Sequence, residues 1–476
     1  MKSLRVMLLL VAAGGWLAGC SQPRPKPIAG CNYKVLPLTV GPKWHQPWRG
    51  PDAAAATVLD QAETPEVAEL GRALQARRLR NAGLRRAAIT GVPRDQFLAL
   101  SGGGQHGAFG AGFFYGMQAA ARAKHDTLPD WDIVTGVSTG SLQSTLLFLA
   151  NQPVPSDRGY GWVDGPMSGK DGATGLVVTP GESNVGDLVL AYSIAQEADL
   201  MRTRRGGAIA GALLKGSTAS FAPLRDRLLQ IMTVGTLRAV GQEWVVNKRQ
   251  LFVGVSNLDD GAGYGIDMTE LAARTLSTRA AGDLARIQGC YVDALLASAS
   301  VPPGVPPVTL QTDRSTNLYM DGGARFGMFL EPVLAARRAA GEDRPADVTL
   351  MVNTSMAAGP WNGDGTPTQR WSVVSAALRA VNLMETQVYV FSAAAVADLG
   401  IARGGLNMAV LGNGGIPGGE PPETHRFDGK SCSQWQAIDA RAKPLQFYPR
   451  YMACTADYGR SRGVIAQWNH RMPAQP

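Results

Sequence analysis

The pattern of apolar and polar positions changes at about residue 96. From there on, short apolar runs alternate with longer stretches whose apolar residues recur at helical spacing. The predicted strands are Phe97–Leu100, Asp132–Val137, Leu251–Val255 and Val348–Val352. The predicted helices are Ala108–Ala123, Leu142–Ala150, Val292–Ser298 and Val373–Ala395. Such alternation is typical of an α/β domain in which helices are layered on a sheet.

The regions on either side of this domain have a different composition. Residues 21–27 are rich in proline and predict an extended tether. Thr64, Pro65 and Glu66 form a helix-start signal, and the arginine-rich stretch after them predicts a basic helix. That helix presents either a solvated face or a surface for anionic lipid head groups. Beyond about Gly404, glycine, proline and polar residues predict a loop-rich tail.

The N-terminus has the layout of an export signal. Met1–Arg5 is basic, an apolar run continues to Leu17, and small residues lead to Cys20. The apolar run is too short to span a membrane. The ending Leu17–Cys20 resembles the lipobox of bacterial lipoproteins, which implies that Cys20 is lipidated and anchors the chain to a membrane. By the same resemblance, Ser21 implies the outer membrane. The alternative is an ordinary signal with an incidental cysteine.

The export signal limits what the net charge and the cysteines of the chain can mean. The net charge of +8 suits nucleic acid or an anionic lipid surface, and export excludes nucleic acid as a partner. Export also places the remaining cysteines in a compartment that permits disulfides, where four cysteines allow three full pairings. Cys432 and Cys454 share the turn-rich tail and are the favoured pair, with Cys31 left unassigned. Cys290 lies in an apolar helical stretch and is predicted to be a buried thiol.

A candidate nucleophile lies between a predicted strand and a predicted helix. The stretch Gly136–Gly140 has the pattern Gly-x-Ser-x-Gly, centred on Ser138. This is the setting of a nucleophile elbow, where small residues such as Gly136 and Gly140 leave room for a sharp turn. The turn presents the hydroxyl at a helix N-terminus, where the dipole favours developing negative charge. The alternative is a glycine turn with an ordinary serine.

A candidate oxyanion hole follows another predicted strand. Three glycines, Gly102, Gly103 and Gly104, can direct successive amide groups towards one point. A phosphate-binding loop is the alternative interpretation, but no Gly-Lys-Ser/Thr follows these glycines. We therefore predict that their amides stabilise an oxyanion.

The general base has two candidate types. His425 and His470 could formally complete a Ser-His-Asp triad, but both lie in polar segments of the tail. Asp321 follows a short apolar run and directly precedes Gly322 and Gly323, which permit a close approach to another loop. An aspartate within hydrogen-bond reach of Ser138 can take its proton directly. An ordinary Asp-Gly turn is the plain alternative.

Three of these motifs together resemble the patatin-like phospholipase family. They are Gly102–Gly107, Gly136–Gly140 and Asp321–Gly323, in this order, and Ala297–Val308 is similar to the helix end and proline turn before the family's Asp motif. The resemblance implies a three-layer α/β/α fold with a central, mostly parallel sheet. It also implies a Ser138–Asp321 dyad without histidine, metal ion or cofactor. Within the glycine motif, His106 stands before Gly107 where the family usually has Arg or Lys.

The resemblance covers residues 96–400 and implies a lipid acyl hydrolase of the phospholipase A, lysophospholipase or esterase type. Its substrate would be a phospholipid or another acyl ester. We therefore expect a signal peptide over residues 1–19, a lipidated tether and basic segment over 20–95, the hydrolase domain over 96–400, and an extension over 401–476. The expected location is the bacterial cell envelope. The alternatives are a surface lipoprotein that binds lipid or protein without turnover, and a Ser-His-Asp esterase.

Overall fold

The computed structural model describes residues 23–38, 94–170, 175–203, 217–302, 304–331, 345–357, 373–412 and 419–472. The expected signal peptide, Cys20 and the basic helix after Thr64 lie outside these ranges.

A mixed central sheet organises the chain. Its strands follow the order β1 (Val35–Pro37), β7 (Gly263–Asp267), β6 (Gln250–Asn257), β3 (Ile133–Val137), β2 (Asp95–Leu100), β10 (Ala346–Val352), β11 (Leu406–Val410) and β14 (His470–Met472). The run from β6 to β11 is parallel, whereas the pairings β1–β7, β7–β6 and β11–β14 are antiparallel. This confirms the predicted, mostly parallel sheet, and the four predicted strands correspond to β2, β3, β6 and β10.

Further strands lie beside this sheet or apart from it. The hairpin of β8 (Val308–Gln311) and β9 (Thr316–Asp321) pairs with β6 through β9. The remaining short strands are β4 (Arg202–Thr203), β5 (Ala219–Ser220), β12 (Arg426–Phe427) and β13 (Lys430–Ser431). The α-helices are α4 (Gly107–Arg122), α5 (Thr139–Phe148), α6 (Asn184–Ala191), α8 (Ala222–Ile231), α9 (Val234–Asn247), α10 (Met268–Ser277), α11 (Ala281–Ala299), α13 (Val373–Ala402), α14 (Cys432–Asp439) and α15 (Pro449–Val464). Short 3-10 helices are η1 (Gly104–His106), η2 (Pro166–Ser168), η3 (Glu197–Asp199), η4 (Gly322–Ala324) and η5 (Ala440–Ala442).

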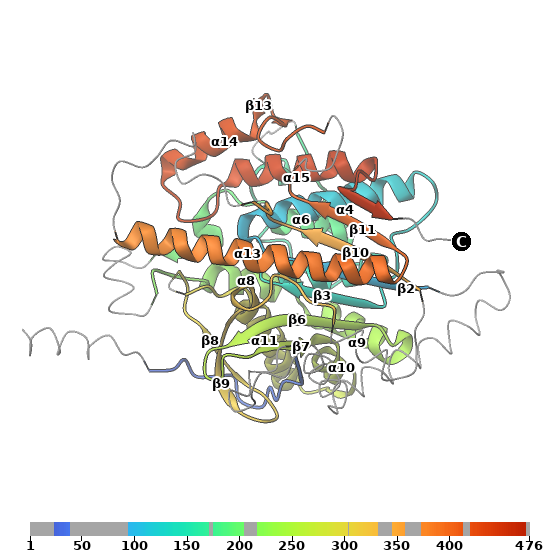
Figure 1. Ribbon diagram of the computed structural model, residues 1–476. Helices are drawn as coiled ribbons and strands as arrows, with labels where there is room; N and C mark the ends of the chain where they lie inside the picture. The colour runs from blue at the N-terminus through green and yellow to red at the C-terminus, as the bar shows by residue number, and fades with distance from the viewer. Residues whose placement is uncertain are drawn as a thin grey trace, which may run out of the picture.

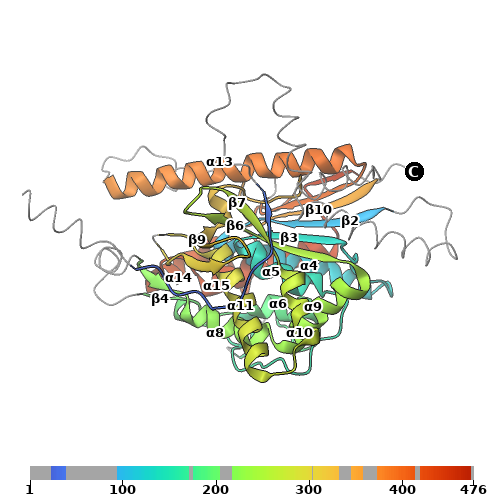
Figure 2. The same cartoon turned by 90° about the horizontal axis from the view of Figure 1, so that it is seen from below.

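The helices form two layers on the sheet. In Figure 1 the long helix α13 crosses in front of the strands, and in Figure 2 it lies alone on one side, with α4, α5, α6, α9, α10, α11 and α15 on the other. Successive residues of β2 belong to different cores: Leu98 and Leu100 pack with the larger helical layer, and Phe97 and Ala99 pack towards α13. Strands buried on both faces are continuously apolar, which explains the short apolar runs in the sequence.

The C-terminal region differs from the loop-rich tail that the sequence predicts. Strands β11 and β14 extend the central sheet, and α15 packs against α4. The two helices touch through glycines: a Cβ placed on Gly112 would lie 2.6 Å from the carbonyl carbon of Ala456, and one on Gly459 would lie 2.9 Å from the nitrogen of Phe113. Because glycines take part in this interface beside the ring contact of Phe109 and Tyr458, the apolar stripe of α15 is weaker than that of a usual packed helix.

Two disulfides join distant parts of the chain. The structure links Cys432 to Cys454, the pair that the sequence favours, with 5.4 Å between their Cα atoms. It also links Cys290 to Cys31 across 259 positions, so the prediction of a free Cys290 thiol is wrong. The sequence around Cys290 is that of a buried helix, and only the fold brings the N-terminal segment beside α11.

Helix α13 is the longest helix among the described residues, yet it belongs to the packed domain. Its side chains Ala393 and Val396 are buried in the core on its side of the sheet. None of the helices in the described ranges combines the length and the apolar character that crossing a membrane requires.

Candidate active site

Ser138 occupies a sharp turn between β3 and α5. Its backbone has φ 54° and ψ −125°, a conformation that non-glycine residues adopt only when the surroundings enforce it. The flanking glycines explain how the turn fits. A Cβ on Gly140 would lie 2.7 Å from the carbonyl carbon of Leu100, and one on Gly136 would lie 2.7 Å from the carbonyl carbon of Gly140. The turn therefore has the geometry expected of a nucleophile elbow.

The end of α11 supports this turn. The backbone nitrogen of Ser138 donates a hydrogen bond to Oγ of Ser298 (3.1 Å), whose hydroxyl donates to the carbonyl oxygen of Gly254 (2.7 Å). Ser298 thus connects the turn to the neighbouring strand β6. It lies in the segment before the Asp motif that the sequence analysis singled out.

Asp321 reaches Ser138 from the end of β9. The side chain of Ser138 lies close enough to the Asp321 carboxyl group to lower the pKa of that group, and Oδ1 of Asp321 accepts a hydrogen bond from the amide of Gly323 (2.7 Å). The residue is buried, with 3% of its surface exposed. A Cβ on Gly322 would lie 2.8 Å from the carbonyl oxygen of Gly254, so a larger residue would push Asp321 away from the elbow. Residues 138 and 321 therefore lie near each other in the structure, and their action as a catalytic dyad stays a prediction.

Burial sets the protonation of Asp321. It raises the pKa of the carboxyl from 3.8 to about 7, while the nearby Ser138 side chain and the hydrogen bond from the Gly323 amide act in the opposite direction. The negative charge of Glu385 adds a smaller upward contribution. A carboxylate with a pKa near 7 is suited to accept a proton at neutral pH.

The glycine loop joins β2 to α4 beside Ser138. Gly103 has φ 147°, which favours glycine strongly, and a Cβ there would lie 2.8 Å from the carbonyl carbon of Asn353. The amide of Gly102 donates to the carbonyl oxygen of Gly327 at 3.3 Å. Gly103 and Gly104 both line the cavity that contains Ser138. Of the three glycines, Gly102 thus donates its amide to the protein, and Gly103 and Gly104 line the cavity.

Asn353 holds this loop in place. Its backbone amide donates to Oγ of Ser101 (2.8 Å), and its side-chain Nδ2 donates to the carbonyl oxygen of Ser101 (2.9 Å). The same Nδ2 donates to Oε1 of Gln143 on α5 (3.0 Å). Asn353 therefore couples the loop to the helix that carries Ser138 at its N-terminus. The sequence contains no signal for this role, because Asn353 lies far from the motifs.

His106 and Gly107 complete the loop. His106 lines the cavity, packs edge-on against Tyr451 with 5.9 Å between ring centroids, and has a pKa lowered by burial to about 4. It is neutral at physiological pH and supplies no positive charge to the site. A Cβ on Gly107 would contact Oγ1 of Thr139 and lie 2.8 Å from Cζ of Tyr192. Gly107 thus allows α4 to approach the elbow.

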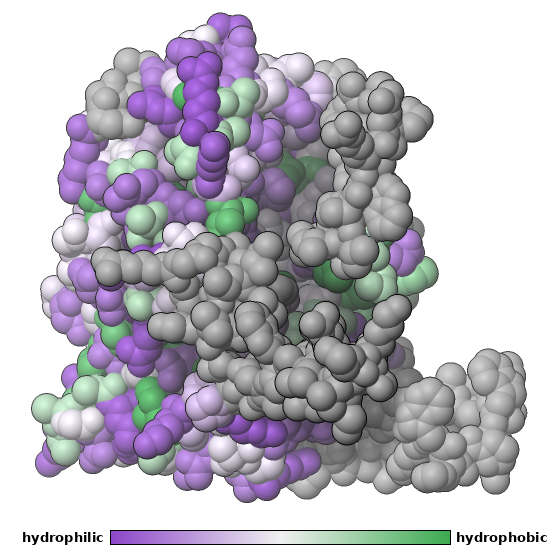
Figure 3. All heavy atoms as spheres, turned by 90° about the vertical axis from the view of Figure 1, so that its left-hand side faces the viewer, coloured by the Kyte–Doolittle hydropathy of each residue, from purple (hydrophilic) through white to green (hydrophobic). Residues whose placement is uncertain are grey.

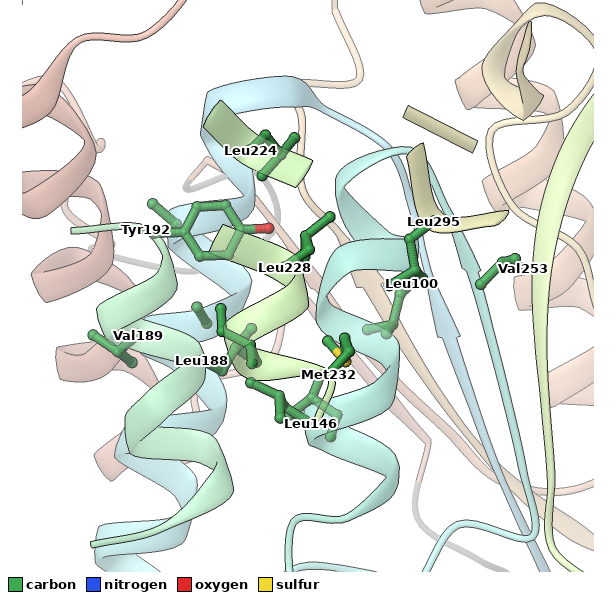
Figure 4. Close-up of a cluster of buried hydrophobic side chains, with 14 of the residues drawn as sticks. Leu100, Leu146, Leu188, Val189, Tyr192, Leu224, Leu228, Met232, Val253 and Leu295 are labelled. Atoms are coloured by element: carbon green, nitrogen blue, oxygen red, sulfur yellow. The ribbon is translucent and has the colours of Figure 1, made fainter. Parts of the chain in front are cut away.

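An apolar cavity of about 310 Å³ opens beside Ser138. Figure 4 shows apolar side chains of α5, α6 and α8 close to one another, among them Leu146, Leu188 and Leu228. The apolar side chains that line the cavity include Leu146, Leu188, Leu224, Leu228 and Met232. The volume lies at the lower end of the range for small-molecule sites.

One wall of the cavity comes from α13. Asn382, Glu385, Thr386 and Tyr389 line it, at the spacing of one helix face. The sequence predicts a helix here but not this role, although polar residues at helical spacing within an apolar helix are a usable signal. By contrast, neither His425 nor His470 is among the lining residues. Nε2 of His425 lies 3.0 Å from Oδ2 of Asp457.

The outward side of α13 is apolar near this wall. Val381, Met384 and Phe391 are 52%, 62% and 68% exposed. Figure 3 views the molecule from the side at which α13 begins and shows hydrophobic side chains exposed there. Exposed apolar groups beside a cavity are typical of sites that meet an apolar partner.

Comparison with known proteins identifies the class. Residues 98–334 match the family model of patatin-like phospholipases, so the chain carries a domain of the patatin-like phospholipase family. The crystal structure of VipD from Legionella pneumophila is similar at 13% sequence identity, covering 79% of this chain and 67% of that chain with a TM-score of 0.27. No curated protein matches the sequence. The presence of this domain supports lipid acyl hydrolysis as the general activity.

Proposed function

We propose that this protein hydrolyses carboxylic esters of lipids through Ser138 as nucleophile and Asp321 as general base. The observation that carries the proposal is the placement of the Ser138 side chain beside the buried carboxyl group of Asp321, in a strained turn that borders an apolar cavity. A hydroxyl activated by an adjacent base is the usual arrangement for acyl transfer.

The reaction proceeds in two halves. Asp321 takes the Ser138 proton as Oγ attacks the ester carbonyl, and the amides of Gly103 and Gly104 stabilise the tetrahedral oxyanion. Collapse of this intermediate expels the alcohol, which receives the proton from Asp321, and leaves the acyl group on Ser138. A water molecule then gives a proton to Asp321 as it attacks the acyl-enzyme. Collapse of this second intermediate releases the fatty acid, and Asp321 returns the proton to Oγ of Ser138.

The surroundings of the dyad support a lipid as substrate. The leucine-rich cavity matches an acyl chain in polarity, and the exposed apolar side chains of α13 suit a substrate held in a lipid surface. The substrate class is therefore a phospholipid, lysophospholipid or related acyl ester.

The proposal is tested with Ser138→Ala and Asp321→Asn in a lipid hydrolysis assay read by mass spectrometry of the released fatty acids. Both variants should lose activity while keeping the circular dichroism of the wild type. Matched controls are Ser277→Ala and Asp313→Asn, because Ser277 is exposed and Asp313 forms a surface ion pair with Lys34 at 3.4 Å.

Two outcomes contradict the proposal. Full activity of the Asp321 variant with loss of activity in a His425 variant would favour a Ser-His esterase. A folded wild-type protein that hydrolyses no lipid ester and never reacts with a fluorophosphonate at Ser138 would favour a non-catalytic binding protein.

We further propose that the protein is exported and anchored in the bacterial cell envelope by lipidation of Cys20. The lipobox-like ending Leu17–Cys20 supports this, and so do two disulfides, which persist in oxidising compartments. Cells fed radiolabelled palmitate should label the wild type but not Cys20→Ala, which should leave the membrane fraction. Equal labelling of both would contradict the anchor.

A further inference from the structure

Tyr389 projects from α13 into the space between the glycine loop (residues 102–104) and the turn that follows Asp321. It lines the cavity and is 4% exposed. A Cβ on Gly102 would contact the Tyr389 hydroxyl and lie 3.0 Å from Cζ, and a Cβ on Gly323 would lie 3.0 Å from the same hydroxyl oxygen. The phenol oxygen therefore stands between the glycine loop and the turn that follows Asp321. The family match ends at residue 334, so this side chain comes from outside it.

Ser138 borders the same position. A Cβ placed on Gly102 would contact Tyr389, and the same Cβ would lie 2.9 Å from Cβ of Ser138. Since one small volume beside Gly102 is bounded by both side chains, the hydroxyl of Tyr389 lies close to the reacting serine. The amide of Gly102 is already used by Gly327, which leaves this part of the loop without a backbone donor for the substrate.

The ring of Tyr389 is fixed, whereas its hydroxyl is available. A Cβ on Gly327 would lie 2.6 Å from Cδ1 of Tyr389, so the ring packs directly on that backbone. Within the described ranges the hydroxyl forms no hydrogen bond to the protein, although buried tyrosine hydroxyls usually have a partner. Burial, with the nearby charges of Asp321 and Glu385, raises the pKa of Tyr389 well above its usual value. The phenol is thus neutral and keeps its proton for donation.

We propose that the Tyr389 hydroxyl donates a hydrogen bond to the oxyanion of the tetrahedral intermediate, as a third donor beside the amides of Gly103 and Gly104. The inference rests on the proposed ester hydrolysis and adds a catalytic residue to it. Placing a preorganised donor where negative charge develops lowers the barrier of the chemical step more than it strengthens substrate binding.

The first test is Tyr389→Phe, which removes only the hydroxyl. We expect kcat to fall by about 100-fold, the effect of losing one oxyanion donor, while KM changes by less than about threefold. Tyr115→Phe is the matched control, because Tyr115 lies on α4 outside the cavity lining. It should retain wild-type kcat. Retention of full kcat by the Tyr389 variant would overturn the proposal.

The second test separates a donor from a purely structural role. Each enzyme is assayed with a carboxylic ester and with the matching thionoester, whose sulfur is a weaker hydrogen-bond acceptor. Wild type should prefer the oxygen ester more strongly than Tyr389→Phe does, since the variant has already lost one of the bonds that the sulfur weakens. This preference is a ratio and does not depend on the fraction of enzyme that is folded. An unchanged preference in the variant would overturn the proposal.

These results are distinguishable from failure of the proposed function itself. If the wild type hydrolyses the ester and Ser138→Ala does not, ester hydrolysis stands whatever Tyr389→Phe does. If the wild type hydrolyses neither ester, both the proposed function and this inference fall.

Discussion

Replacement of Asp321 by asparagine should stabilise the protein while abolishing its activity. The pKa of this buried carboxyl is raised in the folded state, so the folded protein holds its proton more tightly than the unfolded chain does. The stabilising contribution of the protonated form is complete below the ordinary pKa of 3.8. It is lost progressively as the pH rises to about 7, where the folded protein must bury a charge.

The size of the effect follows from the two pKa values. Raising the pKa from 3.8 to about 7 corresponds, at about 1.36 kcal/mol per pKa unit, to roughly 4 kcal/mol of unfolding free energy lost above pH 7. Asparagine carries no charge and avoids this loss. Since Asp321 is 3% exposed, solvent screens the effect little.

The assay measures the unfolding free energy of wild type and Asp321→Asn by urea denaturation at several pH values between 4 and 8. Unfolding is monitored by circular dichroism, with both disulfides intact. The variant should be more stable than wild type by a few kcal/mol at pH 8, and the difference should shrink towards zero at pH 4. Asp313→Asn serves as control, because the Asp313 carboxylate lies in a surface ion pair, where charge contributes little.

The pH dependence decides whether the reasoning holds. A difference of the same size at pH 4 and pH 8 would show that asparagine acts by packing or hydrogen bonding and not by removing a buried charge. A variant less stable than wild type at pH 8 would show that the carboxylate is well compensated in the folded state, contrary to the raised pKa.

Three further predictions concern activity and stability. The kcat/KM for hydrolysis of a neutral ester should fall about tenfold for each pH unit below 7, because only ionised Asp321 accepts the serine proton. A kcat/KM that stays constant from pH 5 to 8 would contradict this. Gly103→Ala should lower kcat by at least about 100-fold in the same assay, because alanine disfavours φ 147° and would displace the glycine loop. An unchanged kcat would exclude that loop from catalysis. Leu146→Trp should shift the preferred substrate towards shorter acyl chains in a series of p-nitrophenyl esters, and an unaltered preference would place the acyl chain elsewhere.

Local turn chemistry made the centre of the site predictable from the sequence. Gly136 and Gly140 flank a strained serine, and the glycines at 102–104 and 322–323 permit close backbone contacts. Because these contacts require glycine, the glycines in the sequence indicate where they occur. The strands β2, β3, β6 and β10 were predictable for a similar reason, since burial on both faces leaves a continuous apolar run.

Other features depend on contacts between distant parts of the chain. The partner of Cys290 lies 259 positions away, and nothing near either cysteine indicates it. Asn353 and Tyr389 act on the glycine loop only because β10 and α13 pass beside it. Helix α15 escaped detection because glycines, which do not count as apolar positions, make part of its contact with α4 beside the Phe109–Tyr458 ring pair.

The glycine contact between α4 and α15 has a consequence for the timing of activity. Helix α4 begins at Gly107, directly after the glycine loop, whereas its partner helix α15 begins only at Pro449. A nascent polypeptide therefore lacks the surface on which α4 rests until α15 has been synthesised. We expect the proposed ester hydrolysis to appear only after α15 has been made and has packed against α4.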